Sequence, residues 1–462
     1  MGMLDGPHDA AHRISHLGVL GFGALWLIAG AALLFGGGTK NDLFTDLFLQ
    51  ALAVAALLLA LSKLRLEQLS NERRQLILIA CAVALVPLLQ VVPMPYFFWS
   101  WLPGRSEIFA AQSAAGVQSF WQPYSLDPAA TLAAFRSLLP ALAVVALGMQ
   151  LRLAQLRRIG LLVLPAALLM VPIGIAQVAG GPHSPLRPYL PTNPHDAVGL
   201  FANRNHYAAL MVVALMMALT YARAPIVPLR RSIDNHLWIG ACLLVGSILL
   251  LGIVLSRSRA GFLFAGFGVA AMLLLASLQR REQPKYWSWL IGFSVLASLV
   301  AFQFGFLAIA DRLATLGGSD LRWNVAPSSL SLAAHFGFLG SGIGTYPAAY
   351  AAFEPLEKVT SLYVNHAHND YLELLVDAGV VFVALLLWFA RFLWRLGASI
   401  RWRDLQSEQV FRAGAFLALC LLLAHSFFDY PLRTTALSVV FAWLLVVLVA
   451  PATEPQTREK RR

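Results

Sequence analysis

The segment NHAHNDYLELLVDAG, which begins at Asn365, places two histidines one residue apart directly before an apolar helical pattern. Three interpretations fit these residues: metal ligands, a general base, or the polar start of a helix. Asp370 can cap the following helix, and Glu373, three residues later, can act as the returning member of a capping box. This interpretation explains the two acids but leaves His366 and His368 without a structural role.

The spacing His-x-His-x-Asp in HAHND also occurs in some zinc hydrolases, but a zinc site needs three or four protein ligands. The other histidines on the same predicted side of the protein lack ligand spacing; they are His183, His195, His206 and His335. A general base needs less, because one neutral imidazole can accept the proton of a sugar hydroxyl as that oxygen attacks an activated glycosyl carbon. We therefore favour a base, and expect neither a metal nor another cofactor.

Two other segments place arginines at the ends of apolar runs. In GLFANRNHYAAL, Arg204 lies between Asn203 and Asn205, and in LGIVLSRSRAGFLFAG, Arg257 and Arg259 share a short turn. An arginine near the bilayer is costly unless it is paired or faces water, so each is a candidate for function. Guanidinium groups that converge from separate helix ends can hold a pyrophosphate. The alternative is that these arginines extend to lipid headgroups.

The elements that carry these residues are apolar helices. Of the 462 residues, 59% are hydrophobic and only 12% are charged, which is about half the charged fraction of a soluble domain. Runs long enough to cross a bilayer recur along the whole chain. We predict an all-α integral membrane protein, a single polytopic domain over residues 1–462. About twelve transmembrane helices are expected, at residues 17–36, 44–62, 75–93, 131–149, 160–179, 206–222, 238–255, 261–278, 287–306, 371–394, 411–427 and 434–450.

The basic residues predict the orientation of these spans. By parity, the segments on the amino-terminal side hold roughly 23 of the 34 lysines and arginines, so both termini are expected in the cytoplasm. The net charge of +11 therefore marks cytoplasmic loops and does not indicate nucleic acid. Three longer loops lie on the other face, near residues 94–130, 180–205 and 307–370. The last is a large loop between spans nine and ten on the side opposite the cytoplasm, and we expect the functional site on that face.

The order of FANRN, SRSRAG, LSLAAHFGFLGSGIGTYPAAY and HAHNDYLELLVDAGVV resembles the O-antigen ligase and O-antigen polymerase superfamily of bacterial envelope glycosyltransferases. The last segment fits the family's histidine motif, His-Asn followed by nine residues and a glycine, as His368, Asn369 and Gly379. The resemblance covers residues 199–433, which we take as the ligase-like catalytic region. The first five spans match the family only in topology.

The resemblance implies a metal-independent, inverting glycosyltransferase of the bacterial inner membrane with a periplasmic active site. Its donor would be a glycan linked to undecaprenyl pyrophosphate, and its acceptor would be a glycan or the lipid A core. Carried over to this sequence, Arg204 and Arg259 bind the pyrophosphate and His368 activates the acceptor hydroxyl. Arg257 and His366 lie beside these positions and are further candidates that could tune or orient their neighbours.

The loop before the histidine motif also resembles the family. Within it, GSGIGTY predicts either a turn where the backbone closely approaches a glycan or ordinary loop geometry. The candidate substrate-binding residues of the whole region are Asn203, Asn205, Arg322, Tyr346 and Asn369. Near the carboxyl end, DYPLR contains Asp429 and Arg433, for which we predict a structural ion pair.

Several activities stay open from the sequence. A ligase transfers a finished chain to lipid A core, whereas a polymerase extends a lipid-linked chain. The segments VVPMPYFFWSWLPGR and YSLDPAATLAAFRSLLP resemble the long outer loop of exopolysaccharide polymerases, which favours a polymerase slightly. A protein O-oligosaccharyltransferase is a third member of this class. From another class, a lipid-linked glycan transporter or flippase would show polar mid-bilayer helices and symmetric halves, and neither pattern is visible.

Overall fold

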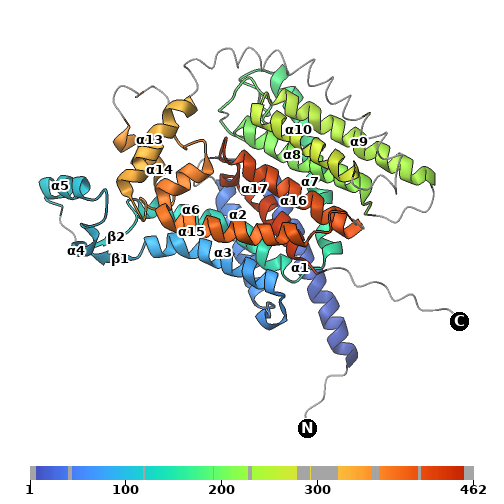
Figure 1. Cartoon of the computed structure of the whole chain (residues 1–462), viewed down its shortest axis with the longest axis horizontal. Coiled ribbons are helices and arrows are strands. Elements are labelled where there is room, and N and C mark those ends of the chain that lie inside the picture. Colours follow the sequence, from blue (N-terminus) through green and yellow to red (C-terminus); the bar gives the residue numbers. More distant parts are fainter. Residues whose placement is uncertain are drawn as a thin grey trace, which may run out of the picture.

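The computed structural model describes residues 7–39, 44–117, 120–190, 192–226, 232–277, 321–354, 364–403 and 407–451, together with residues 292 and 359. These residues form mostly helices (Figure 1). The longer helices are α1 (Pro7–Phe35), α2 (Phe44–Leu61), α3 (Asn71–Gln90), α6 (Pro128–Gly148), α7 (Leu153–Ala179), α8 (Arg204–Arg223), α9 (Ser232–Leu255), α10 (Arg259–Ser277), α13 (Leu321–Phe336), α15 (Asp370–Ser399), α16 (Ser407–His425) and α17 (Thr435–Val449). The shorter ones are η1 (Leu66–Gln68), α4 (Tyr96–Trp99), α5 (Ser106–Ala114), α14 (Tyr346–Phe353) and η4 (Pro431–Arg433).

Among the described residues, eight helices are long and apolar enough to cross a membrane: α2, α6, α7, α8, α9, α10, α15 and α16. Two shorter apolar helical segments, Val19–Phe35 and Thr435–Val449, accompany them. Every predicted span except the ninth overlaps a described helix. The ninth, at 287–306, lies outside the described residues apart from residue 292. The helical membrane class is confirmed, whereas the number of twelve spans stays a prediction.

A small β-ribbon accompanies the helices and does not change the predicted helical class. Strand β1 (Pro93–Pro95) follows α3 directly and pairs antiparallel with β2 (Trp121–Pro123), with Met94 opposite Gln122. Three-residue strands are too short to produce an alternating sequence pattern, so the sequence could not reveal them. The ribbon joins the two ends of the loop that carries α4 and α5, at one edge of the molecule (Figure 1).

Helix α8 lies at the centre of the bundle. Every residue from Asn205 to Ala222 is buried, and α8 packs against α9, α16, α10 and α7. Such a helix is apolar all round because it has no face toward lipid or water. Arg204, the first residue of α8, therefore starts a helix inside the protein, which argues against a simple contact with lipid headgroups.

Helix α15 is interrupted at Gly379, the last residue of the predicted histidine motif. Gly379 adopts φ 54° and ψ −132°, and an added Cβ would lie 2.3 Å from the carbonyl oxygen of Phe338. Only glycine fits this backbone without strain. The interruption lets the amide of Val380 donate to Phe338 O at 2.7 Å, and the amide of Ser341 donates to Val376 O at 2.9 Å. The segment after α13 is thereby held against α15.

Candidate active site

Polar caps begin α8 and α10 next to one another. The Asn203 side chain accepts a hydrogen bond from the Asn205 amide at 2.8 Å, and the Ser258 hydroxyl accepts one from the Gly261 amide at 3.1 Å. Ser258 also donates to the side-chain carbonyl of Asn205 at 2.8 Å, which joins the two helix starts directly. Because helix N-termini carry partial positive charge, this corner of the bundle favours anions.

The start of α15 differs from the predicted capping box. Asn369 is the N-cap, and its side chain accepts from the amides of Tyr371 at 3.0 Å and Leu372 at 3.1 Å. The prediction that Asp370 caps this helix, with Glu373 returning, was wrong by one residue. An asparagine in extended conformation caps as well as an aspartate. Both acids are consequently available for ion pairs, and the predicted substrate contact Asn369 has a structural role.

Two of the three predicted arginines, Arg204 and Arg257, meet at Asp196, a residue that sequence analysis did not identify. One carboxylate oxygen of Asp196 lies 2.5 Å from Arg204 Nη1, and the other lies 3.6 Å from Arg257 Nη1. Arg204 is 18% exposed and Arg257 is 53% exposed, whereas Asp196 is only 6% exposed. Arg257 has a left-handed backbone with φ 51°, unusual for a non-glycine residue. Arg259 is half-buried at the first position of α10.

The other predicted half of the site, His368, is tied to the arginine corner by a buried carboxylate. Asp429 is completely buried and accepts a hydrogen bond from the Asn205 side-chain amide and one from the Tyr430 amide at 3.0 Å. His368 Nδ1 lies 3.3 Å from Asp429 Oδ1. Ser258, Asn205, Asp429 and His368 thus form one polar chain, although they come from four separate segments.

The contact with Asp429 determines what His368 can do. A carboxylate can only accept, so this contact favours the tautomer in which Nδ1 carries the proton and Nε2 presents a lone pair. The side chain is 23% exposed, so the ring is in part open to its surroundings. His368 has φ 52°, a left-handed conformation that non-glycine residues hold only when their surroundings impose it.

The ring of Tyr430 contacts the rings of three histidines. Its ring centroid lies 4.1 Å from that of His366, 4.8 Å from that of His206 and 5.2 Å from that of His368. Tyr430 is completely buried, and burial followed by the charge of Asp429 raises the pKa of its hydroxyl. The phenol therefore stays neutral. Sequence analysis named the adjacent Asp429 but missed Tyr430, because an aromatic residue in an apolar chain gives no signal.

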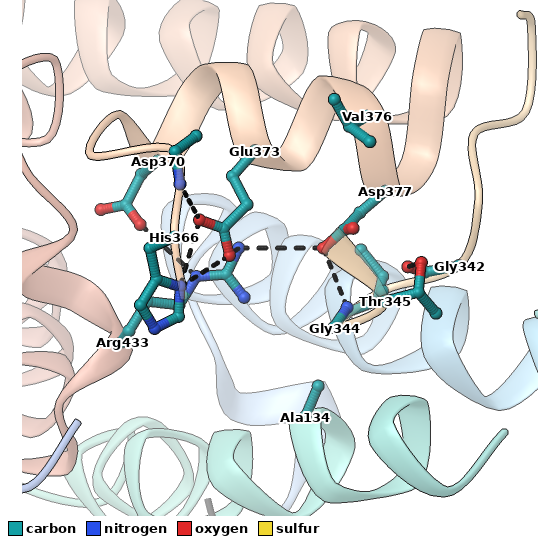
Figure 2. Close-up of polar contacts among 12 residues, drawn as sticks. Ala134, Gly342, Gly344, Thr345, His366, Asp370, Glu373, Val376, Asp377 and Arg433 are labelled. Atoms are coloured by element: carbon teal, nitrogen blue, oxygen red, sulfur yellow. Dashed lines mark hydrogen bonds and ion pairs between the residues drawn. The ribbon is translucent and has the colours of Figure 1, made fainter. Parts of the chain in front are cut away.

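His366 belongs to a second cluster, which Figure 2 shows. Its Nδ1 lies 3.0 Å from Glu373 Oε1, and Arg433 Nη2 lies 3.2 Å from the same oxygen. Arg433 also lies 3.5 Å from Asp370 and 4.0 Å from Asp377. Burial disfavours the charged guanidinium, but the three carboxylates together hold the pKa of Arg433 above its ordinary value. Arg433 thus forms structural ion pairs, but its partners are acids of α15, whereas the predicted partner Asp429 contacts His368.

The same cluster anchors the glycine-rich loop between α13 and α14. The amide of Gly344 donates to the Asp377 carboxylate at 2.8 Å (Figure 2). Gln90, at the end of α3, donates to Asp377 O at 3.2 Å and accepts from the Ile343 amide at 2.8 Å. The loop backbone is therefore held by hydrogen bonds to side chains of α3 and α15.

The two remaining predicted substrate contacts lie on α13 and α14. Tyr346 is completely buried; its hydroxyl lies 2.7 Å from Ser329 Oγ, and its ring stacks on Tyr350 with centroids 5.6 Å apart. Arg322 lies in α13, but its side chain is outside the described part of the chain. Within the described residues, no group of three or more His, Cys, Asp or Glu side chains could hold a metal ion.

The fold and site define a polytopic helical membrane protein in which arginines and a histidine motif meet at one corner. Residues 244–389 match the family model described as O-antigen ligase. The match confirms the resemblance to the O-antigen ligase and polymerase superfamily, whose members are membrane enzymes of the glycosyltransferase type. The matched range contains Arg257, Arg259 and His368, whereas Arg204 and Asp429 lie outside it. No curated protein matches the chain.

Proposed function

We propose that this protein is a membrane glycosyltransferase that moves a glycan from undecaprenyl pyrophosphate to an acceptor hydroxyl. One observation carries the proposal: the polar chain from Ser258 through Asn205 and Asp429 to His368 joins the arginine turn to the histidine motif. Arg204, Arg257 and Arg259 are sequence neighbours of Asn205 and Ser258, so groups suited to a diphosphate adjoin a polar network that ends at a group suited to proton abstraction. The O-antigen ligase match over residues 244–389 supports the same assignment.

The proposed reaction is a direct displacement with inversion. His368 Nε2 accepts the proton of the acceptor hydroxyl, and the oxygen forms a bond with the anomeric carbon. The bond between that carbon and the diphosphate oxygen breaks, and undecaprenyl pyrophosphate leaves with the electron pair. Arg204 and Arg259, with Arg257 beside them, stabilise the charge that develops on the leaving group.

The carboxylate of Asp429 has two effects on this reaction. It fixes the tautomer of His368, and it stabilises the imidazolium that forms when the proton arrives. The proton then passes to water, because His368 is partly exposed. The arginines supply positive charge that a divalent metal supplies in other phosphate-leaving reactions, so we propose a metal-independent enzyme.

We place the reaction on the periplasmic face of the bacterial inner membrane, with both termini in the cytoplasm. This placement follows from the distribution of lysine and arginine among the predicted loops. The lipid donor would enter laterally between helices, since its polyprenyl chain stays in the bilayer while the pyrophosphate reaches the start of α8 and α10.

Of the possible products, we favour extension of a lipid-linked chain over ligation to lipid A core. The full chain can be reconstituted in proteoliposomes with a lipid-linked repeat unit, with and without lipid A core, and the products sized. A ladder of longer chains without core supports a polymerase, and products only on core indicate a ligase. A donor that crosses the bilayer unaltered would indicate a transporter instead.

The same assay tests the absence of a metal. We expect a chelator to leave the rate of donor consumption unchanged. A rate that falls with the chelator and returns with added zinc would contradict the mechanism, because the histidine motif would then act as a metal site.

A further inference from the structure

Two of the three arginines assigned to the donor, Arg204 and Arg257, already share one carboxylate. Asp196 precedes α8; one of its oxygens accepts a hydrogen bond from Arg204, and the other lies 3.6 Å from Arg257 Nη1 as an ion pair. Its backbone is also fixed, since its carbonyl accepts from Arg187 Nη1 at 3.1 Å and its amide donates to Asn193 O at 3.3 Å. The carboxylate therefore bridges two segments that are separated in sequence by α8 and α9.

A carboxylate and a phosphate use the same guanidinium N–H groups. Two unpaired arginines near a bilayer are costly, so Asp196 stabilises the site before a ligand arrives. A diphosphate on the same arginines must approach this negative charge closely, and repulsion is strong in a partly buried site. Arg257 is the partner with room to move, because its side chain is 53% exposed and its contact with Asp196 is the longer one.

We propose that Asp196 is a resident counter-ion of the pyrophosphate site, which competes with the diphosphate for the arginines and so promotes product release. The inference rests on the proposed function. Donor and product carry the same diphosphate, so Asp196 weakens the binding of both. The residue acts through Arg204 and Arg257 and takes no part in the bond changes.

The test is Asp196→Asn, which keeps the size of the side chain and removes its charge. Inorganic pyrophosphate serves as an inhibitor of glycan transfer by the purified full chain. We expect its inhibition constant and the donor KM to fall by about tenfold. The acceptor KM should not change, and kcat should fall because the lipid pyrophosphate leaves more slowly. Asp196→Glu keeps the charge and should stay close to the wild-type values.

Glu107→Gln is the matched control, since Glu107 is an exposed acid of α5 on the loop predicted to share this face. It should leave the inhibition constant unchanged, which excludes a general effect of net charge. An inhibition constant that is unchanged or higher in Asp196→Asn would overturn the inference, because the carboxylate would then only hold the arginines in place. If Asp196→Asn does not fold, Asp196→Ser takes its place with the same expectation.

Calorimetric titration of the same purified proteins with pyrophosphate separates this inference from the proposed function. Tighter binding by Asp196→Asn together with no glycan transfer by the wild type would overturn the function but support the counter-ion. Glycan transfer by the wild type with equal affinity in both proteins would overturn the counter-ion alone. A wild type that neither transfers glycan nor binds pyrophosphate would overturn both.

Discussion

The histidine motif contains two histidine–carboxylate pairs that differ in their surroundings. His368 contacts Asp429, which accepts hydrogen bonds from the side-chain amide of Asn205 and the backbone amide of Tyr430. Through Asn205, this pair connects to the start of α8, where Arg204 lies. The pair of His366 and Glu373 faces Arg433, which lies 3.2 Å from the same glutamate oxygen. The two histidines are one residue apart, and the ring of Tyr430 contacts both.

We interpret the His368–Asp429 pair as the one that takes part in the proposed reaction and the His366–Glu373 pair as structural support. Glu373 shares its charge with Arg433, and that cluster also holds the glycine-rich loop through Asp377. Asp429 instead directs Nδ1 of a partly exposed histidine, whose Nε2 remains for the acceptor. We infer that His368 is the base and that His366 mainly supports the loop and helix start beside it.

The largest expected effect separates the two histidines. His368→Ala should lower kcat by roughly 10²–10⁴-fold because it removes the general base. His366→Ala is the matched control, with only Ala367 between the two histidines. It should lower kcat by less than about tenfold, since Glu373 keeps its ion pair with Arg433. Both rates are measured as donor consumption by reconstituted protein. An equal loss of kcat in the two variants would contradict the assignment of His368 as the base and His366 as a supporting residue.

Stability should depend most on the second cluster. Arg433→Met leaves Asp370, Glu373 and Asp377 without their shared cation, which should cost about 3–5 kcal/mol in unfolding free energy. Denaturant unfolding of detergent-solubilised protein measures this loss, and His366→Ala gives the comparison within the same cluster. An Arg433→Met protein as stable as the wild type would show that the carboxylates do not need this cation.

Asp429→Asn should lower the rate of glycan transfer and leave donor binding unchanged. Asparagine keeps a carbonyl that can accept from His368 Nδ1 but loses the charge that stabilises the imidazolium, so kcat should fall roughly 10–100-fold. The donor KM should stay within about twofold of the wild type. A large rise in donor KM without a change in kcat would place Asp429 on the pyrophosphate side.

The smallest effect concerns Asn369, which was predicted to bind substrate and is found as the cap of α15. Asn369→Ala should cost about 1 kcal/mol of stability. Asn369→Asp retains an acceptor and should recover most of it. Thermal unfolding and the acceptor KM are measured together. Normal stability with a strongly raised acceptor KM would show that Asn369 contacts substrate after all.

The helices were largely predictable because long apolar runs specify them directly. Arg204, Arg257, Arg259 and His368 could be proposed as site residues, since charged or ionisable groups stand out in an apolar chain. The arrangement around them was not predictable. Asn205 and Asp429 are 224 residues apart, and no sequence period reports such a contact. The residues missed or given another role, Asp196, Tyr430 and Asp429, act through these long-range contacts.

The central claim is that Asp429 acts through His368 within one site, and a double-mutant cycle tests it most directly. The rate of donor consumption is measured for wild type, His368→Ala, Asp429→Asn and the double variant. We predict that Asp429→Asn lowers the wild-type rate roughly 10–100-fold but changes the His368→Ala rate by less than about twofold. Losses that multiply in the double variant would contradict the claim, because the two residues would then act independently.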